Sequence, residues 1–79
     1  MASSAVTSAF VKTIAPTAIK RAYGAALRKH RVAAGLSQMK LADKAGIHFT
    51  YLGDAERGRR NIALVNIVRI ARALDLPLD

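Results

Sequence analysis

The sequence predicts an all-α protein, a compact bundle of roughly four to five short helices. Apolar residues recur every three or four positions in separate segments, and no segment alternates apolar and polar residues with the period of a strand. Glycine and proline separate these segments, and 79 residues suffice for one hydrophobic core. We therefore expect one domain over residues 17–79, preceded by a flexible arm over residues 1–16 that is rich in Ala, Ser and Thr.

The first helix is expected at residues 17–34. Pro16 suits the start of a helix, because the first turn leaves its N–H groups without intrahelical partners in any case. Gly35 ends the run. Between them the apolar positions recur at helical spacing, at Ile19, Tyr23 and Leu27.

The next two helices are short and closely spaced, at residues 38–45 and 49–57. Ser37 is a good N-cap for the second helix, and Gly46 can adopt the left-handed conformation that ends it. In the third helix, which ends at Gly58, apolar and polar residues lie on opposite sides. The apolar side holds Leu52 and Ala55, and the other side holds Thr50, Asp54 and Arg57. A loop over residues 59–61 leads to a fourth helix that carries Leu64, Ile67, Ile70, Ala71 and Leu74 and stops before Pro77.

The chain is strongly basic. It carries 13 Lys and Arg against 5 Asp and Glu, a formal net charge of +8. Such a chain is expected to bind a polyanion, and both nucleic acid and anionic membranes are polyanions. No apolar run is long enough to cross a bilayer, and separate short helices do not make the long amphipathic segment of a membrane-surface helix. Nucleic acid is therefore the expected partner, and a membrane is not.

Catalysis and metal binding find no support in the sequence. There is no Cys, which excludes disulfides and thiolate metal sites and fits a cytoplasmic location. No basic residue precedes Lys12, which argues against a secretory signal. His30 and His48 have no nucleophile or metal-ligand motif around them, and the acidic residues are not paired for acid–base chemistry. We expect no enzymatic activity, cofactor, metal or small-molecule substrate.

The stretch from residue 38 to residue 57 has the pattern of a helix-turn-helix. Where two helices cross closely, a small residue is needed at the crossing and a residue tolerant of positive φ in the turn. Ala42 and Gly46 meet these demands. The wedge between the helices would be closed by Leu41, Ala45, Ile47, Leu52 and Ala55. The first turn of the third helix would then be free to enter a major groove.

A resemblance to a known family covers about residues 23–78. It rests on the string GLSQMKLADKAGIHFTYLGDAERGRRN, followed by LVNIVRIARALDLP, which resembles the XRE family, the λ-repressor-like DNA-binding domains of Cro and phage repressors. Within the family, Thr50-Tyr51, Glu56-Arg57 and Arg60-Asn61 are most similar to the controller proteins of restriction-modification systems. The resemblance implies a bacterial, sequence-specific regulator of transcription that binds double-stranded DNA and represses or activates.

The same resemblance implies a set of DNA-binding residues. They are Gln38 at the phosphate backbone, His48 and Tyr51 around the start of the third helix, Phe49, Thr50, Gly53 and Asp54 facing base edges, and Arg57, Arg59, Arg60 and Asn61 gripping the flanking phosphates. Two of them depart from the usual donors. Phe49 can make only apolar contact, for example with a thymine methyl, and Asp54 can accept from cytosine or repel phosphate. Ala63 replaces the usual Ser or Thr cap of the fourth helix, at a cost of about 1 kcal/mol unless Asn61 substitutes.

Two further expectations concern architecture. Arg31 and Glu56 match a family pair that ties the first helix to the end of the third. We also expect a homodimer, because one helix-turn-helix reads only a few base pairs, with Leu76 and Leu78 as the candidate interface. The alternative function is an antitoxin-like or adaptor module that binds a protein partner through the third and fourth helices, with DNA binding incidental. Phe49 and Gly53 keep that alternative open, because they occupy the reading face, the side of the third helix that would face base edges, and neither side chain can form a hydrogen bond with a base.

Overall fold

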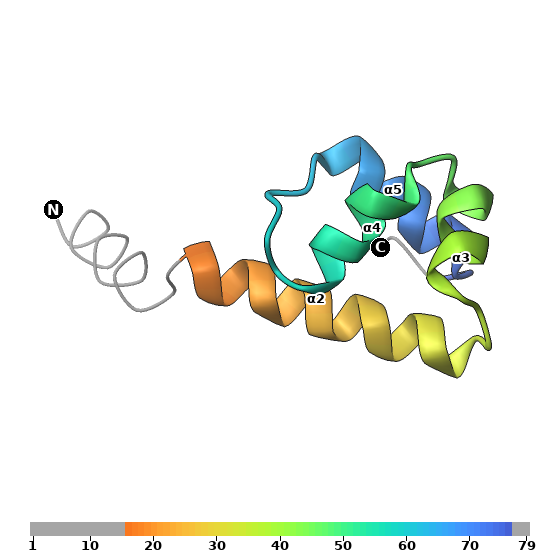
Figure 1. The fold of residues 1–79 in the computed structure, drawn as a ribbon, viewed down its shortest axis with the longest axis horizontal. Helices are drawn as coiled ribbons and strands as arrows, with labels where there is room; N and C mark the ends of the chain where they lie inside the picture. The colour runs from red at the N-terminus through yellow and green to blue at the C-terminus, as the bar shows by residue number, and fades with distance from the viewer. Residues whose placement is uncertain (1–15, 77–79) are drawn as a thin grey trace, which may run out of the picture.

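The computed structural model describes residues 16–76 of the chain (Figure 1). Over these residues the chain forms four helices and no strand, namely α2 (Pro16–Ala33), α3 (Gln38–Ala45), α4 (Phe49–Glu56) and α5 (Leu64–Ala73). The predicted all-α class is confirmed. The expected arm falls outside the described residues, apart from Pro16, which is the first residue of α2 rather than the end of the arm.

The helices pack around α4 and α3. The long α2 lies along one side of the bundle and contacts α4, while α3 contacts both α4 and α5 (Figure 1). The residues that close this core are mostly small or aliphatic, as expected from a chain with no Trp. They are Leu27, Leu41, Ala42, Ala45, Leu52, Ala55, Ile70 and Ala73, with Tyr23, Leu36, Ile47, Ile62 and Leu74 packed against them. The predicted helix-turn-helix wedge is thus confirmed.

The turn between α3 and α4 is built as the sequence predicted. The Ser37 side chain accepts a hydrogen bond from the Lys40 N–H at 3.1 Å and caps the start of α3. Gly46 ends α3 in the left-handed conformation, at φ 72° and ψ 34°. The Ile47 N–H then bonds back to the Ala42 carbonyl at 3.0 Å, which closes the turn. The short turn fixes the angle at which α4 leaves α3.

Gly24 lies where α2 and α4 approach most closely, a feature that the sequence reading missed. A Cβ at this position would lie 2.5 Å from the Glu56 carbonyl oxygen and closer still to that of Ala55. Only glycine fits at such a distance, because both atoms belong to the backbone of α4. Apolar periodicity does not reveal this crossing, since the glycine contributes no side chain to the pattern.

The start of α5 lacks a side-chain cap. Ala63 occupies the N-cap position and makes no capping hydrogen bond, and Asn61 does not supply one either. The Ala63 N–H donates instead to the Tyr51 hydroxyl at 3.2 Å, which joins the start of α5 to α4. Within residues 16–76, no helix is long and apolar enough to cross a membrane.

Candidate nucleic-acid interface

The first turn of α4 is held by His48. Its Nδ1 accepts a hydrogen bond from the Thr50 N–H at 3.1 Å, so a histidine acts as the N-cap of α4. In a neutral imidazole the proton then sits on Nε2, which leaves one ring donor for an outside acceptor. The His48 ring also stacks on Phe49, with centroids 5.3 Å apart and planes 22° apart. Both predicted residues lie exposed at the start of α4.

A partly buried network joins three helices behind this surface. Arg31 on α2 donates to both carboxylate oxygens of Glu56, from Nε to Oε2 at 2.5 Å and from Nη2 to Oε1 at 3.1 Å. Arg31 also donates to the Leu36 carbonyl at 2.8 Å. The Glu56 carboxylate, through these bonds, raises the pKa of Arg31 despite the opposing effect of burial. The expected Arg31–Glu56 pair is confirmed as an architectural feature.

Gln38 belongs to this network, which the sequence reading did not foresee. Its Nε2 donates to the Glu56 Oε1 at 3.0 Å, so the amide connects the first residue of α3 to the end of α4. The side chain is half-buried rather than extended into solvent. The expectation that Gln38 simply abuts a phosphate is therefore incomplete, since its amide group already serves an internal bond.

Asp54 pairs with two arginines instead of standing free on the reading face. Its Oδ1 lies 3.2 Å from the Arg57 Nη2, and its Oδ2 lies 3.3 Å from the Arg60 Nη2. The hydrogen bond from Arg60 lowers the pKa of Asp54 despite the opposing effect of desolvation, and a weaker hydrogen bond from Arg57 acts in the same direction as Arg60. Asp54 thus acts as a clamp that holds Arg57 and Arg60 together, while its contact with cytosine or phosphate stays a prediction.

Tyr51 connects α4 to the start of α5 and to the loop between them. Its hydroxyl accepts from the Ala63 N–H, and the Arg60 guanidinium carbon lies 4.7 Å from the centre of its ring. A cation over an aromatic face is attracted by the ring quadrupole. Tyr51 therefore steers Arg60 from one side while Asp54 holds it from the other. Burial, and to a lesser degree proximity to Tyr51, raises the pKa of the neighbouring Tyr23.

Gly53 is buried in the structure, where the Arg57 side chain covers the face that was predicted to meet base edges. A Cβ on Gly53 would lie 3.3 Å from the Arg57 Nη2 and 3.6 Å from the Gln38 Oε1. The Arg57 side chain, one turn further along α4, folds back over the glycine. A helical wheel places both residues on one face but does not show which side chain covers the other.

The remaining predicted residues lie exposed around the end of α4. Thr50, Arg57, Arg59, Arg60 and Asn61 are all solvent-accessible. In the part of the chain that the structure describes, the Arg59 side chain has no hydrogen-bonding or ionic partner. Gly58 ends α4 in the left-handed region, at φ 71°, and directs the following loop away from the helix. The result is a cationic cluster, formed by Arg57, Arg59 and Arg60, at the end of a helix whose first turn is exposed.

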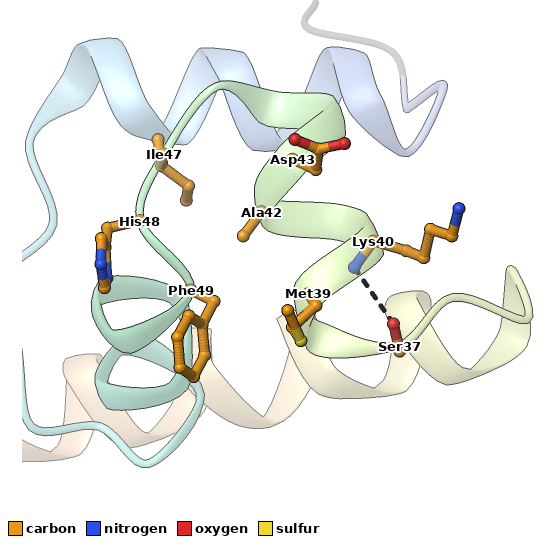
Figure 2. A pocket seen from close by; sticks show the side chains of 8 residues that line it. All are labelled: Ser37, Met39, Lys40, Ala42, Asp43, Ile47, His48 and Phe49. Atoms are coloured by element: carbon orange, nitrogen blue, oxygen red, sulfur yellow. Dashed lines mark hydrogen bonds between the residues drawn. The ribbon is translucent and has the colours of Figure 1, made fainter.

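An open hollow of about 640 Å³ lies between α3 and the start of α4. Figure 2 shows its lining residues, which are Ser37, Met39, Lys40, Ala42, Asp43, Ile47, His48 and Phe49. Met39 is 66% exposed and Phe49 is 47% exposed, although both are large and apolar. Met39 was not predicted from the sequence as part of this surface. It lies opposite Phe49 only because of the angle between α3 and α4, which the sequence pattern does not specify. Among residues 16–76, no three His, Asp or Glu side chains gather closely enough to hold a metal ion.

Comparison with known proteins identifies the arrangement. A family model described as helix-turn-helix matches residues 27–79 of the chain. The chain is 42% identical over 57 residues to the control protein C.BamHI of Bacillus amyloliquefaciens, across 71% of this chain and 70% of the relative. It is 39% identical over 57 residues to the control protein C.SmaI of Serratia marcescens, across 72% of this chain and 68% of the relative.

A solved structure gives the same result. The restriction-modification controller protein C.AhdI from Aeromonas hydrophila matches with a TM-score of 0.75 and 47% sequence identity. The match covers 76% of this chain and 91% of that one. These findings confirm the resemblance to restriction-modification controller proteins that the sequence indicated.

Proposed function

We propose that this chain, which belongs to the helix-turn-helix family, is a transcriptional regulator that binds a specific sequence in double-stranded DNA. The observation that carries the proposal is the exposed edge of α4. Phe49 and Thr50 lie exposed in its first turn, and Arg57, Arg59 and Arg60 lie exposed around its end. An exposed first helical turn, with arginines beyond the other end of the helix, suits a major groove bordered by phosphates.

In this arrangement α4 lies in the groove and α3 crosses the backbone. Thr50 and Phe49 contact base edges, while His48 offers its remaining ring N–H to a phosphate. The exposed cationic cluster holds the backbone beyond the end of α4. Gln38 and Tyr51 act mainly by positioning α4 and Arg60, as their internal hydrogen bonds support. Asn61, exposed in the same loop, lies within the proposed phosphate-binding segment.

We also propose that the protein works as a homodimer in the cytoplasm of a bacterium, by binding rather than by catalysis. A single helix-turn-helix covers too few base pairs to select a promoter. Leu76, one half of the interface expected from the sequence, is half-buried, and Leu78 lies outside the described residues. Leu64 and Val65 at the start of α5 are 74% and 60% exposed and offer a second apolar surface.

A second candidate function is a protein-interaction module, antitoxin-like or adaptor-like, for which DNA binding is incidental. The exposed Phe49 and Met39 favour it, because apolar side chains on a surface often mark a protein contact. The cationic cluster that follows α4 favours DNA, since a protein partner does not require three neighbouring guanidinium groups.

Selection from a pool of random-sequence duplexes tests the proposal. We expect repeated rounds of binding and amplification to enrich one sequence that survives a large excess of competitor DNA at physiological salt. The matched control is Thr50→Ala with Arg59→Ala, which keeps the fold and should abolish enrichment. Weak, salt-sensitive retention of every duplex, with no enriched sequence, would favour the protein-interaction module.

A further inference from the structure

The hollow between α3 and α4 is apolar at the end that adjoins the exposed first turn of α4. In Figure 2 the Phe49 ring and the Met39 side chain lie across its mouth, one from each helix, with Ala42 between them and Asp43 at the opposite end. His48 stacks on Phe49 and caps α4, so the ring is held in place before any ligand arrives. A preformed apolar site of this kind loses little side-chain entropy on binding.

The chemistry of the major groove restricts what can fill such a site. Base pairs present hydrogen-bond donors and acceptors there, and the apolar group among them is the 5-methyl of a pyrimidine. Phe49 and Met39 offer no hydrogen bond to a base edge but can enclose a methyl group. We propose that the apolar end of this hollow, at Phe49 and Met39, receives the 5-methyl group of a major-groove pyrimidine, so that the protein distinguishes thymine and 5-methylcytosine from uracil and unmethylated cytosine.

The proposal rests on the proposed DNA-binding function and names the chemistry that its reading face selects. Charge around the hollow supports nucleic acid as the occupant. Lys40 lies exposed on its rim, in the first turn of α3, where it can meet a phosphate beside the enclosed base. The cationic cluster follows the same helix α4 at its other end. The hollow thus has Lys40 in its lining and the cationic cluster beyond the far end of α4, with Asp43 as the one acidic residue among the lining side chains.

Base analogues that differ by one methyl group test the proposal. In the duplex enriched by selection, each thymine is replaced in turn by deoxyuridine, and binding is measured by fluorescence anisotropy. We expect one position in each half-site to weaken binding about fourfold, the worth of one buried methyl group. Exchange of that T·A pair for C·G should weaken binding further, and 5-methylcytosine in the C·G pair should restore about the same factor.

Protein variants identify the residues responsible. Phe49→Ala and, separately, Met39→Ala should reduce the thymine-to-uracil ratio toward one, while thermal melting shows that each variant remains folded. Val32→Ala is the matched control, because Val32 is an apolar residue on α2 that is 57% exposed. It should leave the ratio unchanged.

Three outcomes separate the hypotheses. If no duplex is enriched, the proposed DNA-binding function fails, and this proposal fails with it. If a duplex is enriched but every uracil replacement is neutral, or Phe49→Ala keeps the full ratio, the methyl site is overturned and the DNA-binding function stands. If Phe49→Ala changes sedimentation of the protein without DNA, a second copy of the chain occupies the hollow and the methyl site is again overturned.

Discussion

At the scale of single residues, the reading face is shaped by contacts within the protein. Asp54 engages Arg57 and Arg60, Tyr51 supports Arg60, and His48 supports Phe49. Each predicted DNA-binding side chain other than Thr50, Arg59 and Asn61 thus has an internal partner or is covered by one. Such partners restrict the rotamers of long side chains, which lowers the entropy lost on binding.

Asp54→Asn should strengthen non-specific DNA binding several-fold and reduce discrimination. The change removes a negative charge from the proposed interface and releases Arg57 and Arg60 to any phosphate within reach. Binding constants for the selected duplex and for a random duplex, measured over a salt series, check it. Asp75→Asn, at an exposed residue beyond α5, is the matched control. Unchanged binding of random DNA by Asp54→Asn would contradict the clamp.

The ion pairs of Asp54 with Arg57 and Arg60 depend on pH, because they require an ionised carboxylate. Because the two arginines lower the pKa of Asp54, its carboxylate stays ionised in the folded protein at pH values where a free aspartate begins to protonate. Any stability from these pairs is present above the ordinary aspartate pKa and is lost as the pH falls through the lowered one. The clamp is therefore intact at neutral pH.

At the scale of helices, the end of α4 depends on Glu56. Its carboxylate is 3% exposed and accepts from Arg31 on α2 and Gln38 on α3. Glu56→Ala should lower the free energy of unfolding by about 3 to 5 kcal/mol, because it leaves the Arg31 charge unpaired in a site where it is only 12% exposed. Urea unfolding checks this, with the exposed Asp43→Ala as control. A parental midpoint with altered site preference would instead put Glu56 on the DNA face.

Gly24→Ala should destabilise the protein by about 1 to 3 kcal/mol or more, although alanine is the better helix former. The added Cβ meets the carbonyl oxygens of Ala55 and Glu56, and moving them would shift α4 as a whole. Thermal melting checks the sign. The exposed neighbour Ala25, changed to Gly, should cost only the roughly 1 kcal/mol of lost helix propensity. A raised midpoint for Gly24→Ala would show that the two helices can separate at no cost.

These elements also show what the sequence can predict. Ser37, Gly46 and Gly58 act locally, through a cap or a positive φ, so the ends of α2, α3 and α4 followed from the sequence to within one residue, whereas α5 ends at Ala73, well before the Pro77 that was expected to stop it. The sequence did not predict how the helices pack against one another. The closeness of α2 to α4 at Gly24 and the covering of Gly53 by Arg57 depend on crossing angles and rotamers, which no residue pattern specifies.

At the scale of the whole molecule, the net charge of +8 predicts salt-sensitive binding. Arg59→Ala and Arg60→Ala should each flatten the slope of log K against log salt by about one unit, the loss of one phosphate contact. The exposed Lys29→Ala on α2 carries the same charge change and should leave the slope unchanged. Slopes equal to the parent for both arginine variants would remove the loop after α4 from the interface.

The last prediction is that two copies of the chain pair before or upon binding DNA. A dimer presents two α4 helices to half-sites about one helical turn, roughly 34 Å, apart. We expect the contact at Leu64 and Val65, because these aliphatic side chains are exposed at the start of α5, whereas Leu76 is already half-buried.

Sedimentation of the parent and of the double variant Leu64→Asp, Val65→Asp, with and without the selected duplex, measures this directly. The parent should sediment as a dimer and protect two half-sites, and the variant should be a folded monomer with affinity reduced at least tenfold. Val32→Asp, an equally polar change at an exposed site on α2, is the control and should remain dimeric. Loss of the dimer in Leu76→Asp alone, with Leu64→Asp, Val65→Asp still paired, would place the contact at the end of α5 instead. A parent that is monomeric and protects one half-site with full affinity would exclude a dimer, since a single α4 would then suffice for recognition.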